Sequence, residues 1–149
     1  MPELNAHPIF QKISQYSPED TLYLQNMRKR LESIFSTAFK RDLFIAIDAE
    51  QTYLQDAIRN VAEQFQQIHN GTGRYILNTY QAYLKSTYHH IQVELLKNQF
   101  IKKPLAIKLV RGAYLVEESA LSTEGGYENP IHNSLEETHS CYDHSAESI

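Results

Sequence analysis

Leu43-Phe44-Ile45-Ala46-Ile47 is an unbroken apolar run that ends at Asp48, and it decides the fold class. An alternating pattern would bury one face of a strand, whereas a continuous run buries both faces, which is typical of a parallel strand. Two further apolar runs follow at residues 75–77 and 105–110. The three runs begin about one βα unit apart, so the sequence predicts parallel strands in chain order with helical crossovers on one face.

Amphipathic helices are predicted before and between these strands. Ser17-Pro18-Glu19-Asp20 combines a capping residue, a proline suited to the first helical position and the acidic partner of a capping box. Apolar residues then recur at every third or fourth position, which predicts a helix over about residues 18–38. Stripes of the same spacing, over residues 54–68 and 84–95, predict two more helices, and Pro104 prevents the later one from continuing.

A polar residue follows or interrupts each apolar run at an even interval. Asp48, Asn78 and Lys108 are each 30 residues apart. The carboxyl ends of parallel strands face the ligand in α/β folds, so an acid, an amide and an amine would point into one mouth. Polar residues also end strands simply because the chain returns to the surface, and the spacing alone leaves both interpretations open.

The length fits a part of a barrel. Three parallel strands do not close a (β/α)₈ barrel, which takes about 250 residues. Ser134 and Glu137 resemble a further capping box, and the sequence ends at Ile149 within the helical pattern that follows. We therefore expect about three of the eight units of a larger domain.

Composition excludes several classes of protein. Apolar residues make up 42% and charged residues 21%, as in ordinary globular chains and unlike disordered ones. The net charge is −4 and the basic residues are scattered, which argues against a nucleic-acid partner. The single cysteine, Cys141, excludes an internal disulfide. We see no apolar run near the roughly 20 residues of a membrane span, and no signal or transit peptide.

Three motifs at the strand ends carry a family resemblance. They are Asp48-Ala49-Glu50-Gln51-Thr52, Asn78-Thr79-Tyr80-Gln81-Ala82-Tyr83-Leu84-Lys85 and Lys108-Leu109-Val110-Arg111-Gly112-Ala113-Tyr114. In this order and spacing they closely resemble the proline dehydrogenase (proline oxidase) family, in forms similar to its eukaryotic, mitochondrial branch. Gly126-Tyr127-Glu128-Asn129-Pro130-Ile131 resembles the stretch after the third motif, so the likeness runs over residues 43–142.

The resemblance implies an α/β flavoenzyme on a (β/α)₈ TIM-like barrel. Such an enzyme binds FAD non-covalently and oxidises L-proline to Δ1-pyrroline-5-carboxylate in proline catabolism, and its electrons pass to a quinone. It implies a mitochondrial location and allows peripheral membrane association of the full-length enzyme. Residues 1–149 would form a partial barrel, with a helical segment at 1–42 and strands three to five with their helices at 43–149. We expect this chain alone to be inactive and to bind FAD weakly.

The family's site residues carry over by motif. Asp48 resembles the aspartate beside flavin and substrate, and Lys108 stands where bacterial members have an arginine at the reactive edge of the flavin, so both are assigned catalytic roles. A cation there stabilises the negative charge of the reduced ring, although lysine fixes direction less well than arginine. The resemblance assigns cofactor contacts to Ile47, Asn78, Arg111, Gly112 and Ala113, and a substrate contact to Tyr114. No metal is implied.

Two departures from the family pattern concern the third motif. The family usually has a glutamate–arginine pair soon after its glycine-alanine-tyrosine, whereas here Glu118 is followed by Ser119. An ion pair of the family is therefore expected to be missing. The stretch near Asn133, where contacts to the adenosine part of the cofactor are expected, also varies. Glu50 is an alternative catalytic acid, but an acid near a helix start more commonly stabilises the helix dipole.

Alternative functions remain open. The hydroxyproline-oxidising branch shares these motifs. A non-catalytic, truncated relict is also compatible, because the family's first two strands, last three strands and carboxylate-clamping final helix are not present in this sequence. An unrelated phosphate-binding module lacks support because only isolated glycines occur. A metal site at His139, Cys141, Asp143 and His144 is disfavoured, since polar residues on a surface helix explain that cluster.

Overall fold

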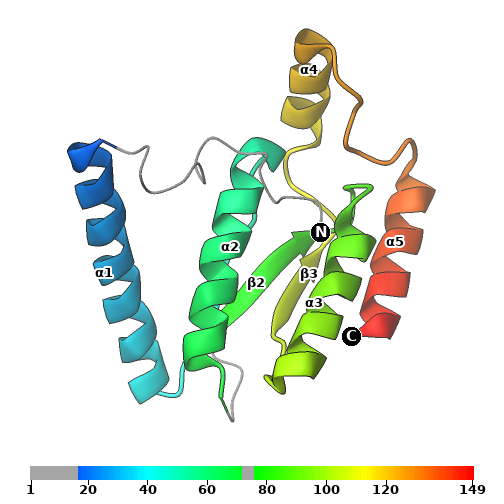
Figure 1. The fold of residues 1–149 in the computed structure, drawn as a ribbon. Coiled ribbons are helices and arrows are strands. Elements are labelled where there is room, and N and C mark those ends of the chain that lie inside the picture. The colour runs from blue at the N-terminus through cyan, green and yellow to red at the C-terminus, as the bar shows by residue number, and fades with distance from the viewer. Residues whose placement is uncertain (1–16, 72–75) are drawn as a thin grey trace.

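The computed structural model describes residues 17–71 and 76–149 as a layer of helices over a small parallel sheet (Figure 1). Its elements, in chain order, are α1 (Pro18–Lys40), β1 (Ile45–Ile47), α2 (Thr52–His69), β2 (Ile76–Gln81), α3 (Thr87–Ile101), β3 (Ile107–Val110), α4 (Leu115–Gly125) and α5 (Leu135–Ser148).

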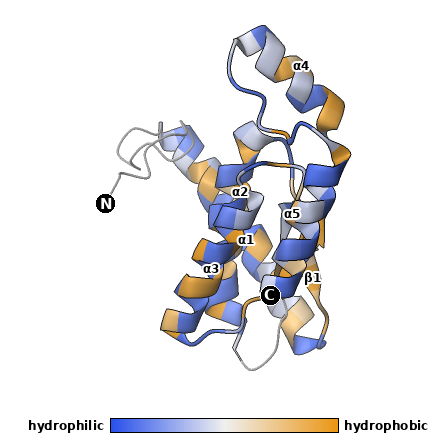
Figure 2. Ribbon diagram, turned by 90° about the vertical axis from the view of Figure 1, so that its right-hand side faces the viewer, coloured by the Kyte–Doolittle hydropathy of each residue, from blue (hydrophilic) through white to orange (hydrophobic). Residues whose placement is uncertain are grey.

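The three strands form one sheet in the order β1-β2-β3, with both pairs parallel. Ile47 pairs with Asn78, and Asn78 pairs with Ile107. This topology confirms the predicted parallel strands in sequence order. Helices α2 and α3, which connect them, lie on the same side of the sheet (Figure 1). Figure 2 shows α3 and β1 on opposite sides of the described part, and no helix of residues 17–71 and 76–149 covers the face of the sheet opposite α2 and α3.

The strand boundaries differ from the sequence prediction for local reasons. The first strand was predicted from residue 43, but the Leu43 amide donates to the Ala38 carbonyl at 2.9 Å and still belongs to the end of α1. β3 begins at Ile107 rather than at residue 105. β2 continues to Gln81, four residues past the predicted end, because residues from Asn78 to Gln81 pair with β3. The predicted start of that strand, residue 75, lies outside the described residues.

The core lies between α1, α2 and the sheet. Phe35, Phe65 and Ile76 are at most 3% exposed and contact one another, with Ile45 and Ile47 packed against them. The rings of Phe35 and Phe65 meet edge to face at a centroid distance of 4.6 Å. Because Ile76 faces these helices, alternation along β2 directs every second residue from it toward them and the others toward the open face.

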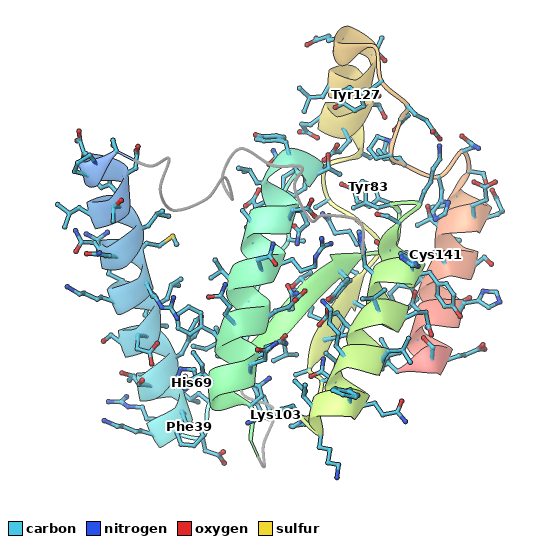
Figure 3. All side chains as sticks on the ribbon, viewed as in Figure 1. Phe39, His69, Tyr83, Lys103, Tyr127 and Cys141 are labelled. Carbon is cyan, nitrogen blue, oxygen red and sulfur yellow. The ribbon has the colours of Figure 1, made fainter. Side chains whose placement is uncertain are left out.

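Buried amides fasten α2 to the sheet at the amino-terminal ends of the strands. The Gln66 side chain donates to the carbonyls of Ile76 and Ala106, at 3.0 and 2.7 Å. Asn70 accepts from the Ile76 amide and donates to the Ile76 carbonyl. His69, at the end of α2 that lies beside α1 (Figure 3), stacks on Phe65. These contacts bond the amide and carbonyl of Ile76 and give a second donor to the Ala106 carbonyl, which also accepts from the Asn78 amide.

The predicted capping box is present at α1, and only half of the predicted box is formed at α5. At α1 the Ser17 hydroxyl accepts from the Asp20 amide, and the Asp20 carboxylate accepts from the Ser17 amide. At α5 the Ser134 hydroxyl accepts from the Glu137 amide at 3.1 Å, but the Glu137 carboxylate accepts from the Asn133 amide instead of the Ser134 amide. α3 starts at Thr87, so Leu84 precedes the helix instead of lying in its stripe; it packs with Tyr83 and Ile131. No helix among the described residues combines the length and apolar character needed to cross a membrane.

Candidate active site at the carboxyl ends of the strands

An ion pair marks the open face of the sheet. The Lys108 ammonium lies 2.5 Å from the Asp48 carboxylate, and their side chains are 41% and 72% exposed. Asp48 follows β1 directly, and Lys108 is the second residue of β3. β2 lies between those strands, so the pair spans the middle strand. The two residues to which the family resemblance gives catalytic roles are thus brought together.

Asn78 does not join them, which corrects the expectation of a shared mouth. Asn78 pairs with Ile47, whose side chain lies in the core under the helices, and Asn78 itself is 1% exposed. The residue of β2 paired with Lys108 is Thr79. A shift of one residue reverses the face of a strand, so the even 30-residue interval placed Asn78 on the wrong side. The predicted contact of its amide with a flavin stays a prediction.

Gln81, which the sequence analysis did not assign, links the two loops of the site. Its amide nitrogen donates to the Glu50 carbonyl at 2.9 Å, and its amide oxygen accepts from the Ala113 amide at 3.0 Å. Gln81 is 2% exposed and ends β2. A polar residue at the end of a buried strand would have indicated a site residue. This indication was missed because the sequence analysis ended the strand at residue 77.

Tyr114 lies beside the acidic loop after β1. A hydrogen bond to the Glu50 carboxylate, assisted by burial and by the nearby charges of Glu50 and Asp48, raises the pKa of the Tyr114 phenol. Its hydroxyl therefore stays protonated over a wide pH range and can donate. The loop that carries Asp48 and Glu50 therefore lies close to the loop that carries Tyr114, and the predicted roles of Asp48 and Tyr114 stay predictions.

Arg111 points away from this group, toward α5. Its Nε donates to His139 Nδ1 at 2.9 Å, and its guanidinium carbon lies 4.2 Å from the centroid of the Tyr142 ring. Arg111 directly follows β3, and its side chain contacts α5, whereas the Lys108 side chain contacts Asp48 after β1. A cofactor contact by Arg111 would thus come from a different side than the Lys108 contact.

Gly112 is required by its neighbour Tyr83. Its φ of +147° is rare for residues with a side chain, and an added Cβ would lie 2.4 Å from the Tyr83 ring. Tyr83 is 2% exposed and lies between the strand ends and α4 (Figure 3). Burial, followed by the charge of Glu118, raises the pKa of Tyr83 to about 12. The visible reason for this glycine is the tyrosine ring, and its predicted cofactor contact stays a prediction.

Glu118 has a partner other than the arginine expected from the family pattern. It is fully buried, and its carboxylate accepts hydrogen bonds from the amide and the hydroxyl of Thr52, at 2.5 and 2.7 Å. Thr52 begins α2, whose N-cap residue Gln51 makes no side-chain capping bond. A carboxylate at a helix start satisfies free N–H groups and the helix dipole. Glu118 therefore caps α2 from α4.

The remaining predicted positions are consistent with backbone roles. Ile47 buries its side chain in the core, so only its backbone is directed at the strand end. Ala113 is exposed and its amide is bound by Gln81. In the described part of the chain, no group of three or more histidine, cysteine, aspartate or glutamate side chains could hold a metal ion; of the four residues considered for one, His139 binds Arg111 instead.

These groups can perform electrostatic and hydrogen-bonding chemistry. The Asp48–Lys108 ion pair has the Glu50 carboxylate and the Tyr114 phenol nearby. A cation aimed at developing negative charge contributes most to catalysis when water is excluded. The arrangement suits a reaction in which negative charge develops on a bound group next to Lys108. The molecule that donates the electrons would be held near Asp48 and Tyr114.

Comparisons with known proteins identify the family. The family model described as proline dehydrogenase matches residues 3–149 of this chain. The chain belongs to the proline dehydrogenase family.

Its relatives in this family are much longer. The chain is 34% identical over 141 residues to the mitochondrial proline dehydrogenase 1 of Homo sapiens, which covers 92% of the chain and 24% of the relative. It is 32% identical over 133 residues to a hydroxyproline dehydrogenase of Xenopus laevis, covering 89% of the chain and 28% of the relative. The chain thus spans about a quarter of the length of these relatives.

A solved structure shows the same fold. Proline utilization A from Bdellovibrio bacteriovorus, inactivated by N-propargylglycine, superposes with a TM-score of 0.74 at 20% identity, covering 83% of this chain and 13% of that chain. At this identity the likeness concerns the fold alone. It confirms the predicted fold class, three βα units of the (β/α)₈ type with parallel strands.

Proposed function

We propose that this chain forms three consecutive βα units of a flavin-dependent proline dehydrogenase that oxidises L-proline to Δ1-pyrroline-5-carboxylate. The observation that carries this proposal is the Asp48–Lys108 ion pair at 2.5 Å, on the helix-free face of a sheet from this family. By "complete enzyme" we mean the longer protein in which these units would lie. Its proposed cofactor is FAD and its proposed electron acceptor is a quinone.

The residues present fit a flavin on the open face. Lys108 supplies a positive charge there, and Thr79, directly paired with Lys108, has a buried hydroxyl without a hydrogen-bond partner. Such a face, polar at one end and apolar along its strands, suits a flat ring that develops negative charge. Lys108 would hold the reactive edge, and the backbone at Ile47 and Gly112–Ala113 would contact the rest of the ring. Bound FAD would accept the hydride that leaves the proline ring.

The chain's own residues would position and activate the substrate. Loss of a hydride from the carbon beside the nitrogen requires a secondary amine that has lost its extra proton, and the product then carries a carbon–nitrogen double bond. The Asp48 carboxylate would hold the hydrogen bonds around that amine. The Tyr114 ring would pack on the substrate ring while its hydroxyl is held by Glu50. Lys108 would stabilise the negative charge that develops opposite the amine.

The test is proline-dependent reduction of an electron-accepting dye by the complete enzyme. Asp48→Ala and Lys108→Ala should each lower the rate by about 10²–10³, since each removes an electrostatic group from the site. Glu124→Ala is the matched control, because Glu124 is an exposed carboxylate on α4 with no hydrogen bond to the site. An Asp48 variant that turns over as fast as the Glu124 variant would overturn the proposal.

The 149-residue chain alone is expected to retain no flavin and to oxidise no proline. Its sheet has two open edge strands, and barrels remove such edges by closure. After incubation with FAD and gel filtration, the chain should show no yellow absorbance. Stoichiometric FAD with turnover would mean that the chain assembles a complete site by itself and would contradict the partial-barrel proposal.

The names of the matching relatives indicate the substrate and the location that we propose. Relatives named proline dehydrogenase, from several organisms, match at 30–35% identity, and a hydroxyproline dehydrogenase matches at 32%. We therefore propose L-proline as the substrate and hydroxyproline as the alternative. The human relative is named mitochondrial, and we propose a mitochondrial location for the complete enzyme.

A further inference from the structure

The Asp48–Lys108 ion pair covers a residue that no motif assigned. β1 and β3 are not neighbours, so a salt bridge between their ends must cross β2. Ile47 pairs with Asn78, and Lys108 pairs with Thr79. Asp48, one residue after Ile47, therefore lies level with Thr79 and Lys108, and the residue beneath the crossing is Thr79.

Thr79 points to the same face as the pair. Ile76 packs under the helices, and Thr79 is three residues further along the strand, so alternation directs Thr79 to the opposite, helix-free side. Ala46, which alternation places on that side too, is exposed, as expected of a face that no helix covers. Thr79 is nevertheless only 3% exposed. The ion pair of Asp48 and Lys108 lies on this face, level with Thr79.

The Thr79 hydroxyl has no hydrogen-bond partner in this arrangement. Its Oγ1 is buried and makes no hydrogen bond, which is uncommon because buried polar groups are usually paired. A valine of the same shape would avoid the cost of burying an unpaired hydroxyl. The unpaired Thr79 hydroxyl is therefore explained if the site has a second state in which the hydroxyl makes a hydrogen bond.

We propose that Thr79 is a positioning residue: its hydroxyl donates a hydrogen bond to the Asp48 carboxylate when the Lys108 ammonium turns away from Asp48 to a ligand's negative charge. The inference rests on the proposed function for the nature of that ligand, a flavin. Without Thr79, Asp48 would lose its ion-pair partner on ligand binding and gain none in return. With Thr79, the carboxylate stays fixed in the direction that the substrate amine requires.

The test is a double-mutant cycle that needs neither flavin nor proline. Lys108→Met mimics the state in which the ammonium has left Asp48, with a side chain of similar length and no charge. Thr79→Val replaces the hydroxyl with a methyl group of the same shape. The four proteins, wild type, Thr79→Val, Lys108→Met and the double variant, are compared by the midpoint of thermal unfolding of the complete protein without added flavin.

The proposal predicts that the effect of Thr79→Val changes sign. With Lys108 present, the valine removes an unpaired buried hydroxyl and should raise the midpoint by about 2 °C. With Met at position 108, the valine removes the new bond to Asp48 and should lower the midpoint by a similar amount. Thr79→Ser, which keeps a hydroxyl, should not lower the midpoint in the Lys108→Met background.

Two results would overturn the proposal. One is a shift of the same sign in both backgrounds, and the other is a serine variant that behaves like valine beside Met at position 108. Either would mean that Thr79 acts through packing alone. Because no cofactor takes part, a protein that fails to bind flavin would disprove the proposed function and leave this cycle interpretable.

Discussion

Removal of the Glu118 carboxylate should loosen the site without touching its charged residues. Glu118 is fully buried in α4 and accepts two hydrogen bonds from Thr52, at 2.5 and 2.7 Å. Thr52 opens α2, directly after the loop that carries Asp48. The change to test is Glu118→Ala, with Glu117→Ala as the matched control, because Glu117 is the exposed neighbour on the same helix.

The expected magnitude follows from these bonds. A hydrogen bond to a charged group contributes about 1.5–3 kcal/mol, but burying a carboxylate offsets part of that gain. The α2 N-cap makes no side-chain bond of its own, so the Thr52 amide would lose its partner. We expect Glu118→Ala to lower the free energy of unfolding by about 2–4 kcal/mol. An exposed substitution such as Glu117→Ala should stay within about 0.5 kcal/mol.

The assay combines urea unfolding with hydrogen exchange of the complete protein. Exchange should accelerate at the Thr52 amide and in the first turn of α2 in the Glu118 variant. A cycle with Thr52→Ala should give a coupling energy of about 1–3 kcal/mol, since the two residues contact each other. Additive effects of the two substitutions, or a Glu118 variant as stable as the Glu117 variant, would refute the capping role.

Three further outcomes follow from the structure. Gly112→Ala should destabilise by about 2 kcal/mol or more in urea unfolding, because the new Cβ would meet the Tyr83 ring at a strained backbone angle. Burial, and then the charge of Glu94 on α3, raises the pKa of Glu63 on α2 above its ordinary 4.5. The folded state therefore holds the Glu63 proton more tightly than the unfolded state, and the stability of the wild-type protein falls as pH rises from about 4.5. Glu63→Gln should remove that loss, so the stability of the variant relative to wild type, measured by urea unfolding, should increase with pH. Asp48→Asn should slow proline oxidation in dye reduction while leaving the unfolding midpoint nearly unchanged, as that side chain is 72% exposed.

The sequence predicted the order and direction of the strands because that information is local. Unbroken apolar runs at one-unit intervals and capping residues at Ser17 and Ser134 do not depend on distant contacts. The same holds in part for Asp48 and Lys108. Asp48 directly follows β1 and Lys108 is the second residue of β3, and parallel pairing through β2 brings the two residues level with each other.

The face of each side chain could not be predicted so simply. The register of β2 against β3 places Thr79, not Asn78, beside Lys108. Side chains alternate between the two faces of a strand, so an interval of 30 residues between strands does not tell on which face each residue lies. Gln81 and Glu118 were missed because their partners, Ala113 and Thr52, are far away in the sequence. Each is a polar residue in a buried strand or helix, and such residues usually make a hydrogen bond. The sequence alone does not show with which residue.

The most direct test of the central claim is anaerobic mixing of the flavin-loaded complete enzyme with L-proline. The account predicts that the flavin absorbance is lost on mixing, that the loss is slowed strongly by Lys108→Ala, and that Glu124→Ala leaves it unchanged. Trans-4-hydroxy-L-proline in a parallel experiment separates the two candidate substrates. A complete enzyme that retains no flavin, or whose bound flavin keeps its absorbance with both substrates, would contradict the account.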